Sequence, residues 1–252
     1  MPPAGKGRGP FAIPFVFGGL GSGSVCVRLA DLADVFWPTM AVVERAVMNA
    51  TNLLTTVYSG AINRDPELHN KWISISFNLG SIAGKIHTLA LQRLGRLDMM
   101  LRLLEGERLE IMKSAASHEP DWSLDLQFSL SQSWLFSAYE VARAAKKPFT
   151  ASHQDASRLF ALEHRLALIR MPLAKGVIQG MDRKSHKNNL PVLMRVGDET
   201  PEIYADNGSY IMPQGLCGET GAALWCPVDI SAGETIAICR RDLSDEMLAL
   251  FD

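Results

Sequence analysis

Two arginine–histidine pairs are the residues of this chain whose types and spacing suit phosphate chemistry. Arg158 precedes His164 by six residues, and Arg64 precedes His69 by five. A histidine can transfer a proton near neutral pH, and an arginine can hold a phosphate through two parallel hydrogen bonds. The first pair is therefore a candidate catalytic pair for a nuclease or another phosphate-handling enzyme, and the second pair is the alternative.

Helical-bundle ribonucleases of the HEPN type use an arginine–histidine pair at a similar spacing. The spacing does not identify that family, because about one such match arises by chance among the arginines and histidines of this chain. Leu159 follows Arg158 where the family usually has a polar residue, and Pro66 lies inside the other pair. The alternative interpretation of His164 is a partly buried helix residue with a hydrogen-bond partner.

The cysteines and glycines predict neither a metal nor a cofactor. Cys217, Cys226 and Cys239 are nine and thirteen residues apart, whereas zinc sites normally take their ligands in close pairs. The glycine cluster at 18–22 lacks the first glycine of a dinucleotide-binding turn. A hairpin expected around residues 231–233 would bring Cys226 near Cys239, close enough for an oxidative bridge, although buried free thiols are the commoner outcome.

Composition and charge narrow the function classes further. The 25 basic and 27 acidic residues give a formal net charge of −2, so no global field favours nucleic acid or anionic lipid. Basic residues gather only between residues 165 and 187, a segment without aromatic side chains for base stacking, so the support for nucleic-acid contact is weak. No apolar run is long enough to predict a membrane span. Four cysteines without close pairs favour a cytoplasmic location.

Apolar residues that recur every three or four positions predict an antiparallel helical bundle over residues 39–176. Further helical stretches are expected over 67–90 and from 132 to 148. Arg102 and Glu105 fall off the apolar stripe of their helix and are expected on its solvated face. Three apolar stripes carry the prediction: Val43, Val47, Ala50, Leu54 and Val57; Leu94, Leu97, Leu101, Leu104 and Ile111; and Leu159, Leu162, Leu166, Ile169 and Leu173.

Residues 122–130 do not follow the helical period. Apolar and polar residues alternate strictly from Trp122 to Leu130, which is the period of a strand. A strand among helices would need a partner from the C-terminal part of the chain. Strand and helix therefore both remain open for this segment.

The remaining segments are expected to be irregular or to form short strands. Residues 1–38 are rich in glycine and proline and are expected to be an irregular or flexible lead-in. A basic linker is expected over 177–189, followed by a β-rich subdomain over 190–252 that ends in a short helix. Asp206-Asn207-Gly208 predicts a hairpin over 202–212, and residues 231–233 predict another. The expected fold class is mainly α with a small β-rich C-terminal unit.

No sequence typical of P-loops, serine hydrolases or zinc proteases is present. The sequence therefore predicts a non-enzymatic binding or regulatory protein, with a possible protein partner and no pattern that specifies an oligomeric state. The alternative is the nuclease or phosphate-handling enzyme that uses Arg158 and His164, or Arg64 and His69.

Overall fold

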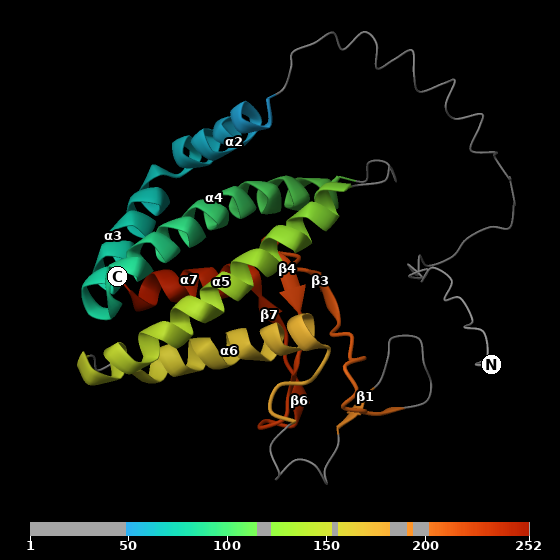
Figure 1. The fold of residues 1–252 in the computed structure, drawn as a ribbon. Helices are drawn as coiled ribbons and strands as arrows, with labels where there is room; N and C mark the ends of the chain where they lie inside the picture. Colours follow the sequence, from blue (N-terminus) through green and yellow to red (C-terminus); the bar gives the residue numbers. More distant parts are fainter. Residues whose placement is uncertain (1–48, 115–121, 153–155, 182–190, 194–201, 252) are drawn as a thin grey trace, which may run out of the picture. The chain divides into compact units, whose positions relative to one another are not determined.

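The computed structural model describes residues 49–114, 122–152, 156–181, 191–193 and 202–251, and these fall within one compact unit. They form a mainly α structure with short antiparallel strands near the C-terminus (Figure 1), which confirms the predicted fold class. The expected irregular segment 1–38, residues 39–48 of the expected bundle, residues 182–189 of the expected linker, and residues 190 and 194–201 of the expected β-rich subdomain lie outside the described residues. Within the described ranges, no helix combines the length and the apolarity that a membrane crossing needs.

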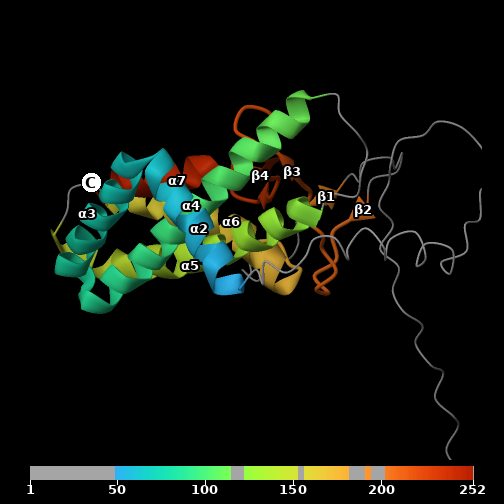
Figure 2. The ribbon, with the colours of Figure 1, turned by 90° about the horizontal axis from the view of Figure 1, so that it is seen from above.

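The described part of the bundle has five helices, and neighbours in sequence pack together, α3 on α4, α4 on α5 and α5 on α6 (Figures 1 and 2). Asp65 separates the first two helices: its carboxylate accepts a hydrogen bond from the Leu68 N–H at 2.9 Å, and Pro66 occupies the first helical position. Gly84, with φ of 105°, divides the next two, so the helical stretch expected over 67–90 is interrupted at this residue. The helices are α2 (Ala50–Arg64), α3 (Pro66–Ala83), α4 (Lys85–Lys113), α5 (Trp122–Ser152) and α6 (Ala156–Lys175).

The segment 122–130 is the first part of α5, so the strand interpretation was wrong. Trp122 and Leu126 are more than half exposed, whereas Gln127 and Ser131 are buried. The polar pair faces inward because the Gln127 amide donates a hydrogen bond of 2.7 Å to the Gly221 carbonyl of a distant turn. The alternating pattern therefore combines two exposed apolar residues with half-buried ones, of which Phe128 and Leu130 pack against the core.

The C-terminal strands form three small antiparallel sheets, β1–β2, β3–β4–β7 and β5–β6. The hairpin predicted around residues 231–233 is confirmed by the pairing of β5 with β6. The elements are β1 (Val192–Leu193), β2 (Glu202–Ile203), β3 (Gln214–Leu216), β4 (Ala223–Trp225), β5 (Val228–Asp229), β6 (Glu234–Thr235), β7 (Ile238–Cys239) and the final helix α7 (Arg240–Leu250).

The hairpin predicted over 202–212 was wrong, because β2 pairs with β1. The turn itself is present, since Gly208 has φ of 77° and Asn207 accepts the Ser209 N–H. After this turn the Tyr210 N–H donates to the Gly176 carbonyl at 2.9 Å. The chain therefore leaves the turn toward the end of α6 and does not return along β2.

One hydrophobic core joins the bundle to the C-terminal elements, since it includes Trp225 of β4, Ile238 of β7 and Leu243 of α7 beside the buried residues of α3–α6. Trp72 of α3 is among the largest buried side chains. Its indole packs directly on Gly95 of α4, where an added Cβ would lie 2.7 Å from the Trp72 Cβ. The close approach of α3 and α4 at this point depends on the missing side chain.

We expect Gly95→Ala to destabilise the protein by about 1–3 kcal/mol, because the new methyl group overlaps the buried indole. Gly60→Ala is the matched control: Gly60 lies in the exposed interior of α2 with nothing within 4 Å of an added Cβ, and the change should stabilise by about 0.5–1 kcal/mol. The free energy of unfolding from denaturant titration checks both. Equal stability of the two variants would contradict this description of the α3–α4 contact.

Candidate functional site

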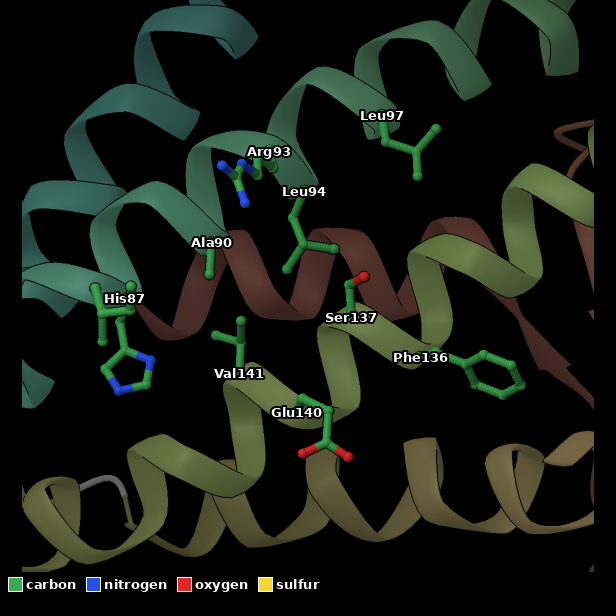
Figure 3. Close-up of a pocket in the computed structure, with 10 residues that line it drawn as sticks. His87, Ala90, Arg93, Leu94, Leu97, Phe136, Ser137, Glu140 and Val141 are labelled. Atoms are coloured by element: carbon green, nitrogen blue, oxygen red, sulfur yellow. The ribbon is translucent and has the colours of Figure 1, made fainter. Parts of the chain in front are cut away.

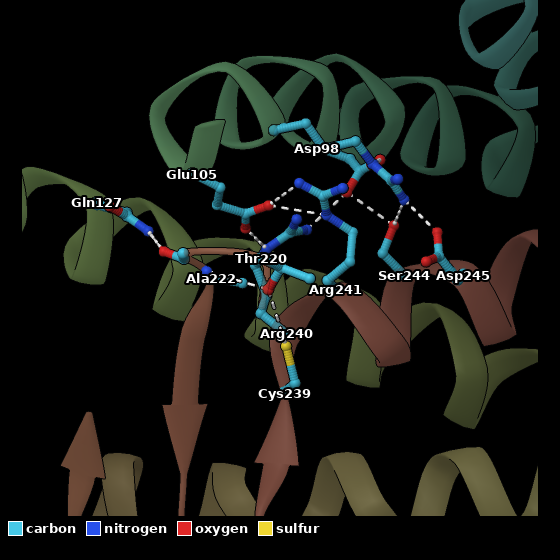
Figure 4. A network of polar contacts seen from close by, with 12 residues as sticks. Asp98, Glu105, Gln127, Thr220, Ala222, Cys239, Arg240, Arg241, Ser244 and Asp245 are labelled. Carbon is cyan, nitrogen blue, oxygen red and sulfur yellow. Dashed lines mark hydrogen bonds and ion pairs between the residues drawn. The ribbon is translucent and has the colours of Figure 1, made fainter. Parts of the chain in front are cut away.

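A buried ion network joins α4 to α7. Asp98, Glu105 and Arg240 have no solvent exposure. The Arg240 Nη1 donates to an Asp98 oxygen at 2.6 Å, and its Nε donates to Glu105. Arg241 donates from Nε and Nη2 to the second Glu105 oxygen at 2.9 and 2.5 Å (Figure 4). Two adjacent arginines of α7 thus hold two carboxylates of α4.

Asp98 accepts hydrogen bonds from four side chains. The donors besides Arg240 are the Trp72 indole at 2.9 Å, Arg102 at 2.8 Å and the Ser244 hydroxyl at 2.7 Å. Burial alone would raise the pKa of the Asp98 carboxyl, but the charges of Arg240 and Arg102 and these hydrogen bonds lower that pKa to about 2. Asp98 is therefore an ionised carboxylate buried in the core.

The network positions two arginines toward solvent. Arg102, partly buried, donates to Ser244 at 3.0 Å and to Asp245 at 2.5 Å in addition to Asp98. Arg241 is likewise only partly exposed. Carboxylates of the protein already fix both guanidinium groups. Ligand binding therefore costs these two side chains little further conformational entropy.

A cavity of about 330 Å³ lies above these two guanidinium groups. Arg64, from the end of α2, is the third arginine on its wall, beside Asp65, Glu219 and Thr220. The guanidinium of Arg64 passes over Gly106, 3.4 Å from where a Cβ would lie. Three arginines from three helices thus converge on one space, which we call the arginine-lined cavity.

The charges on the wall are only partly balanced within the described part of the chain. Arg64 is exposed, and no ion pair to it is found among the described residues. Asp65 is engaged as the N-cap of α3. Arg102 and Arg241 direct Nε and Nη2 to their carboxylates, and no hydrogen bond from Nη1 of either is found among the described residues. Such a donor set suits a carboxylate or phosphate oxygen.

The predicted pair Arg158 and His164 lies on α6 but not on one face of it. Six residues along a helix are separated by about 9 Å and by about 240° of rotation. Arg158 is exposed, and the His164 Nε2 lies 3.2 Å from an Asp229 oxygen. Burial raises the pKa of Asp229, but hydrogen bonds from Ser231 and His164 outweigh it and hold that pKa below its ordinary value. The hydrogen-bond partner expected for His164 is therefore present.

The alternative pair is also divided. Arg64 lines the arginine-lined cavity, whereas His69 packs edge-on against the Tyr58 ring, with the ring centres 6.2 Å apart. Its ring is not part of the cavity wall. Of the four residues predicted from the two pairs, only Arg64 reaches the cavity.

The predicted basic segment 165–187 is largely neutralised where it is described. Arg165 pairs with Glu246 at 2.8 Å, and Arg170 pairs with Glu140 at 3.6 Å and stacks on the Tyr139 ring. Arg183, Lys184 and Lys187 lie outside the described residues. Across the described residues, no group of three or more histidines, cysteines, aspartates or glutamates comes together as metal ligands.

A second and larger hollow of about 570 Å³ lies between α4 and α5. Ala90, Leu94 and Leu97 of α4 face Phe136 and Val141 of α5 across it (Figure 3). Its charged residues sit at the edge, where Glu140 already pairs with Arg143 at 2.6 Å. The walls are mainly apolar, so this hollow offers fewer convergent polar groups than the arginine-lined cavity does.

The prediction that Glu105 lies on a solvated face was wrong, and Arg102 is also partly buried. That face of α4 is covered by α7 and by the turn at Gly221, whose Cβ position lies 2.2 Å from the Glu105 carbonyl. Sequence reasoning missed Asp98, Arg240 and Arg241 altogether. The signal available in the sequence was Asp98 beside the apolar stripe of its helix and the doublet Arg240-Arg241 at the end of an expected strand.

We expect stability in acid to depend on Asp98. Its pKa is about 2 in the folded protein against an ordinary 3.8, so the ionised carboxylate stabilises the fold above about pH 4, and this stabilisation is lost as the pH falls through 2. This difference in pKa corresponds to about 2 kcal/mol in the free energy of unfolding. Asp98→Asn should be less stable at neutral pH by about 3–5 kcal/mol, since Arg240 loses a counter-charge, and its stability should change less between pH 4 and 2.

Denaturant unfolding at a series of pH values measures both effects. Glu110→Gln is the control, because Glu110 is an exposed carboxylate of the same helix, paired with Lys113. The control should follow the unmodified protein at every pH. An Asp98→Asn protein with an unchanged slope between pH 4 and 2 would contradict the role given to the carboxylate.

Comparison with known proteins does not assign the chain to a family. No model of a protein family matches the chain, no curated protein is detectably similar to it, and no solved structure matches its fold. Function must therefore be inferred from the arginine-lined cavity itself.

Proposed function

We propose that this chain is a non-enzymatic binding protein whose arginine-lined cavity takes a small molecule with a carboxylate or phosphate group. The observation that carries the proposal is the convergence of Arg64, Arg102 and Arg241 on one cavity of about 330 Å³. Charge-assisted hydrogen bonds from arginine to an oxyanion are among the stronger interactions available to a protein.

The fixed positions of two of these arginines support binding over a chance surface patch. Arg102 and Arg241 are held by Asp98 and Glu105, which are themselves buried. These two side chains are therefore already ordered before a ligand binds. Arg64 is the most exposed of the three, and its guanidinium lies over Gly106 on the same wall.

Cavity size and wall charge indicate what kind of anion fits. A volume of about 330 Å³ is at the lower end of the range for small-molecule sites. Glu219 and Asp65 also line the wall and would repel a ligand with many negative charges, such as a nucleic-acid strand. The favoured ligand carries one acidic group and a neutral or cationic remainder.

Isothermal titration of the full chain with inorganic phosphate and, separately, with acetate at constant ionic strength tests the proposal. We expect saturable binding of at least one probe, and the stronger probe distinguishes a phosphate ligand from a carboxylate ligand. Arg64→Gln should weaken that binding about tenfold or more, because a charge-assisted hydrogen bond contributes about 1.5–3 kcal/mol.

Arg96→Gln is the matched control, because Arg96 is an exposed arginine of α4 that does not line the cavity. It should bind as the unmodified protein does. Unfolding midpoints of both variants establish that the fold is intact. No saturable binding of either probe, or equal binding by Arg64→Gln, would overturn the proposal.

The phosphate-handling enzyme is the second candidate, and the contact of His164 with Asp229 favours it. A carboxylate that holds one ring nitrogen fixes the orientation of a histidine and leaves the other nitrogen available for proton transfer. The second requirement, an arginine beside that histidine, is not met by Arg158, which faces another side of α6.

An RNA cleavage assay separates the two candidates. We expect neither the unmodified protein nor His164→Ala to cleave a single-stranded RNA above background. Cleavage by the unmodified protein that is abolished in His164→Ala and reduced in Asp229→Asn, with unfolding midpoints unchanged, would replace the binding proposal with the enzyme.

A further inference from the structure

Two cysteines meet beside the arginine-lined cavity. Cys217 follows β3 and begins the tight turn that leads into β4, in which its N–H donates to the Ala222 carbonyl and its carbonyl accepts the Gly221 N–H, both at 2.8 Å. Cys239 ends β7 and is the N-cap residue of α7. The strand order β3–β4–β7 brings these two distant segments into one sheet.

Thr220 connects the two thiols. Its hydroxyl lies 3.7 Å from the Cys239 sulfur, which points toward it in Figure 4. Although burial acts to raise the pKa of Cys217, the Thr220 hydroxyl and the Cys239 thiol both contribute to lowering it, so the Cys217 thiol lies beside these two groups. Both cysteines are free in this structure. The sequence predicted that Cys226 would lie near Cys239, but β4 pairs Leu224 with Cys239 and Trp225 with Ile238, so Cys226 is not the residue opposite Cys239.

The two thiols have different surroundings. Cys217 is partly exposed, whereas Cys239 is buried. Burial raises the pKa of Cys217, but hydrogen bonds from the Thr220 hydroxyl and from the backbone N–H groups of Glu219 and Thr220 hold it below its ordinary value. Burial raises the pKa of Cys239. Cys217 is therefore the more readily ionised and more accessible thiol, and the thiolate is the reactive form.

We propose that Cys217 and Cys239 form a reversible disulfide when the protein meets hydrogen peroxide. The Cys217 thiolate attacks one peroxide oxygen, which gives a sulfenic acid at Cys217 and releases hydroxide. The Cys239 sulfur then attacks the Cys217 sulfur, the S–S bond forms, and the hydroxyl leaves as water with the proton from Cys239. In total, two thiols are oxidised by two electrons and one peroxide is reduced to two waters.

The disulfide would join two parts of the cavity wall. Thr220 lines the cavity from the turn after Cys217, and Arg241 lines it two residues after Cys239. The cross-link would therefore limit the movement of this wall. The proposal does not depend on the ligand of the cavity, since it rests only on the two cysteines and Thr220.

Peptide mass spectrometry of the folded full chain tests the proposal. The protein is treated with a small excess of hydrogen peroxide, alkylated and digested without reductant. The expected product is a peptide pair joined through Cys217 and Cys239 with the loss of two hydrogens, and dithiothreitol should reverse it. Cys239→Ser should instead accumulate a sulfenic acid at Cys217 that dimedone traps.

Cys226→Ser is the matched control and should form the disulfide as the unmodified protein does. Thr220→Val, which keeps the shape of the side chain and removes its hydroxyl, should lower the rate of Cys217 alkylation severalfold at neutral pH. A main product that contains Cys226 or Cys26, or no intramolecular disulfide at all, would overturn the proposal. Alkylation of Cys226 faster than Cys217 in the native protein would also overturn it.

Discussion

The contact of Arg240 with Asp98 and Glu105 is the interaction on which the rest of the described structure depends. All three groups are excluded from water, and each buried ion costs several kcal/mol of hydration. The cost is offset only because nearly every charge meets a partner: Asp98 accepts four donors, and Glu105 is shared by two arginines. The guanidinium of Arg240 also lies over the Trp134 ring, 5.4 Å from its centre. Such a cluster tolerates few alternative arrangements of α4 and α7.

The cluster also explains why two arginines can occupy the first turn of α7. Arg240 and Arg241 stand in the first turn of α7, where the helix dipole disfavours positive charge. The carboxylates of α4 compensate for this locally and hold the α7 N-terminus against the bundle. The final helix therefore docks through charge at its beginning and through Leu243, Met247 and Leu248 along its buried side.

The same groups connect the core to the surface. Two carboxylates of α4 are buried and satisfied by arginines, and two of the arginines that they hold, Arg102 and Arg241, line the arginine-lined cavity. The turn at Gly221 packs against α4 so closely that only glycine fits, since its φ is 69° and a Cβ would lie 2.2 Å from the Glu105 carbonyl. This turn brings Thr220 to the cavity wall and to Cys239. The arginine-lined cavity, the ion network and the pair of thiols thus all depend on the packing of α7 and of this turn against α4.

The sequence by itself determined the fold class, since the apolar stripe of Leu159, Leu162 and Leu166 can be buried only on a helix. It also determined the turn at residues 231–233, because turn residues act on their immediate neighbours. It did not determine the break at Gly84, which divides the helical stretch expected over 67–90. Only the tertiary structure decided which polar residues are buried. Glu105 looks like a solvent-facing residue within its own helix, and it becomes internal because α7, more than 130 residues later, covers it. Charge pairing across such distances leaves no periodic mark in the chain, so neither the ion network nor the cavity above it could be found from spacing.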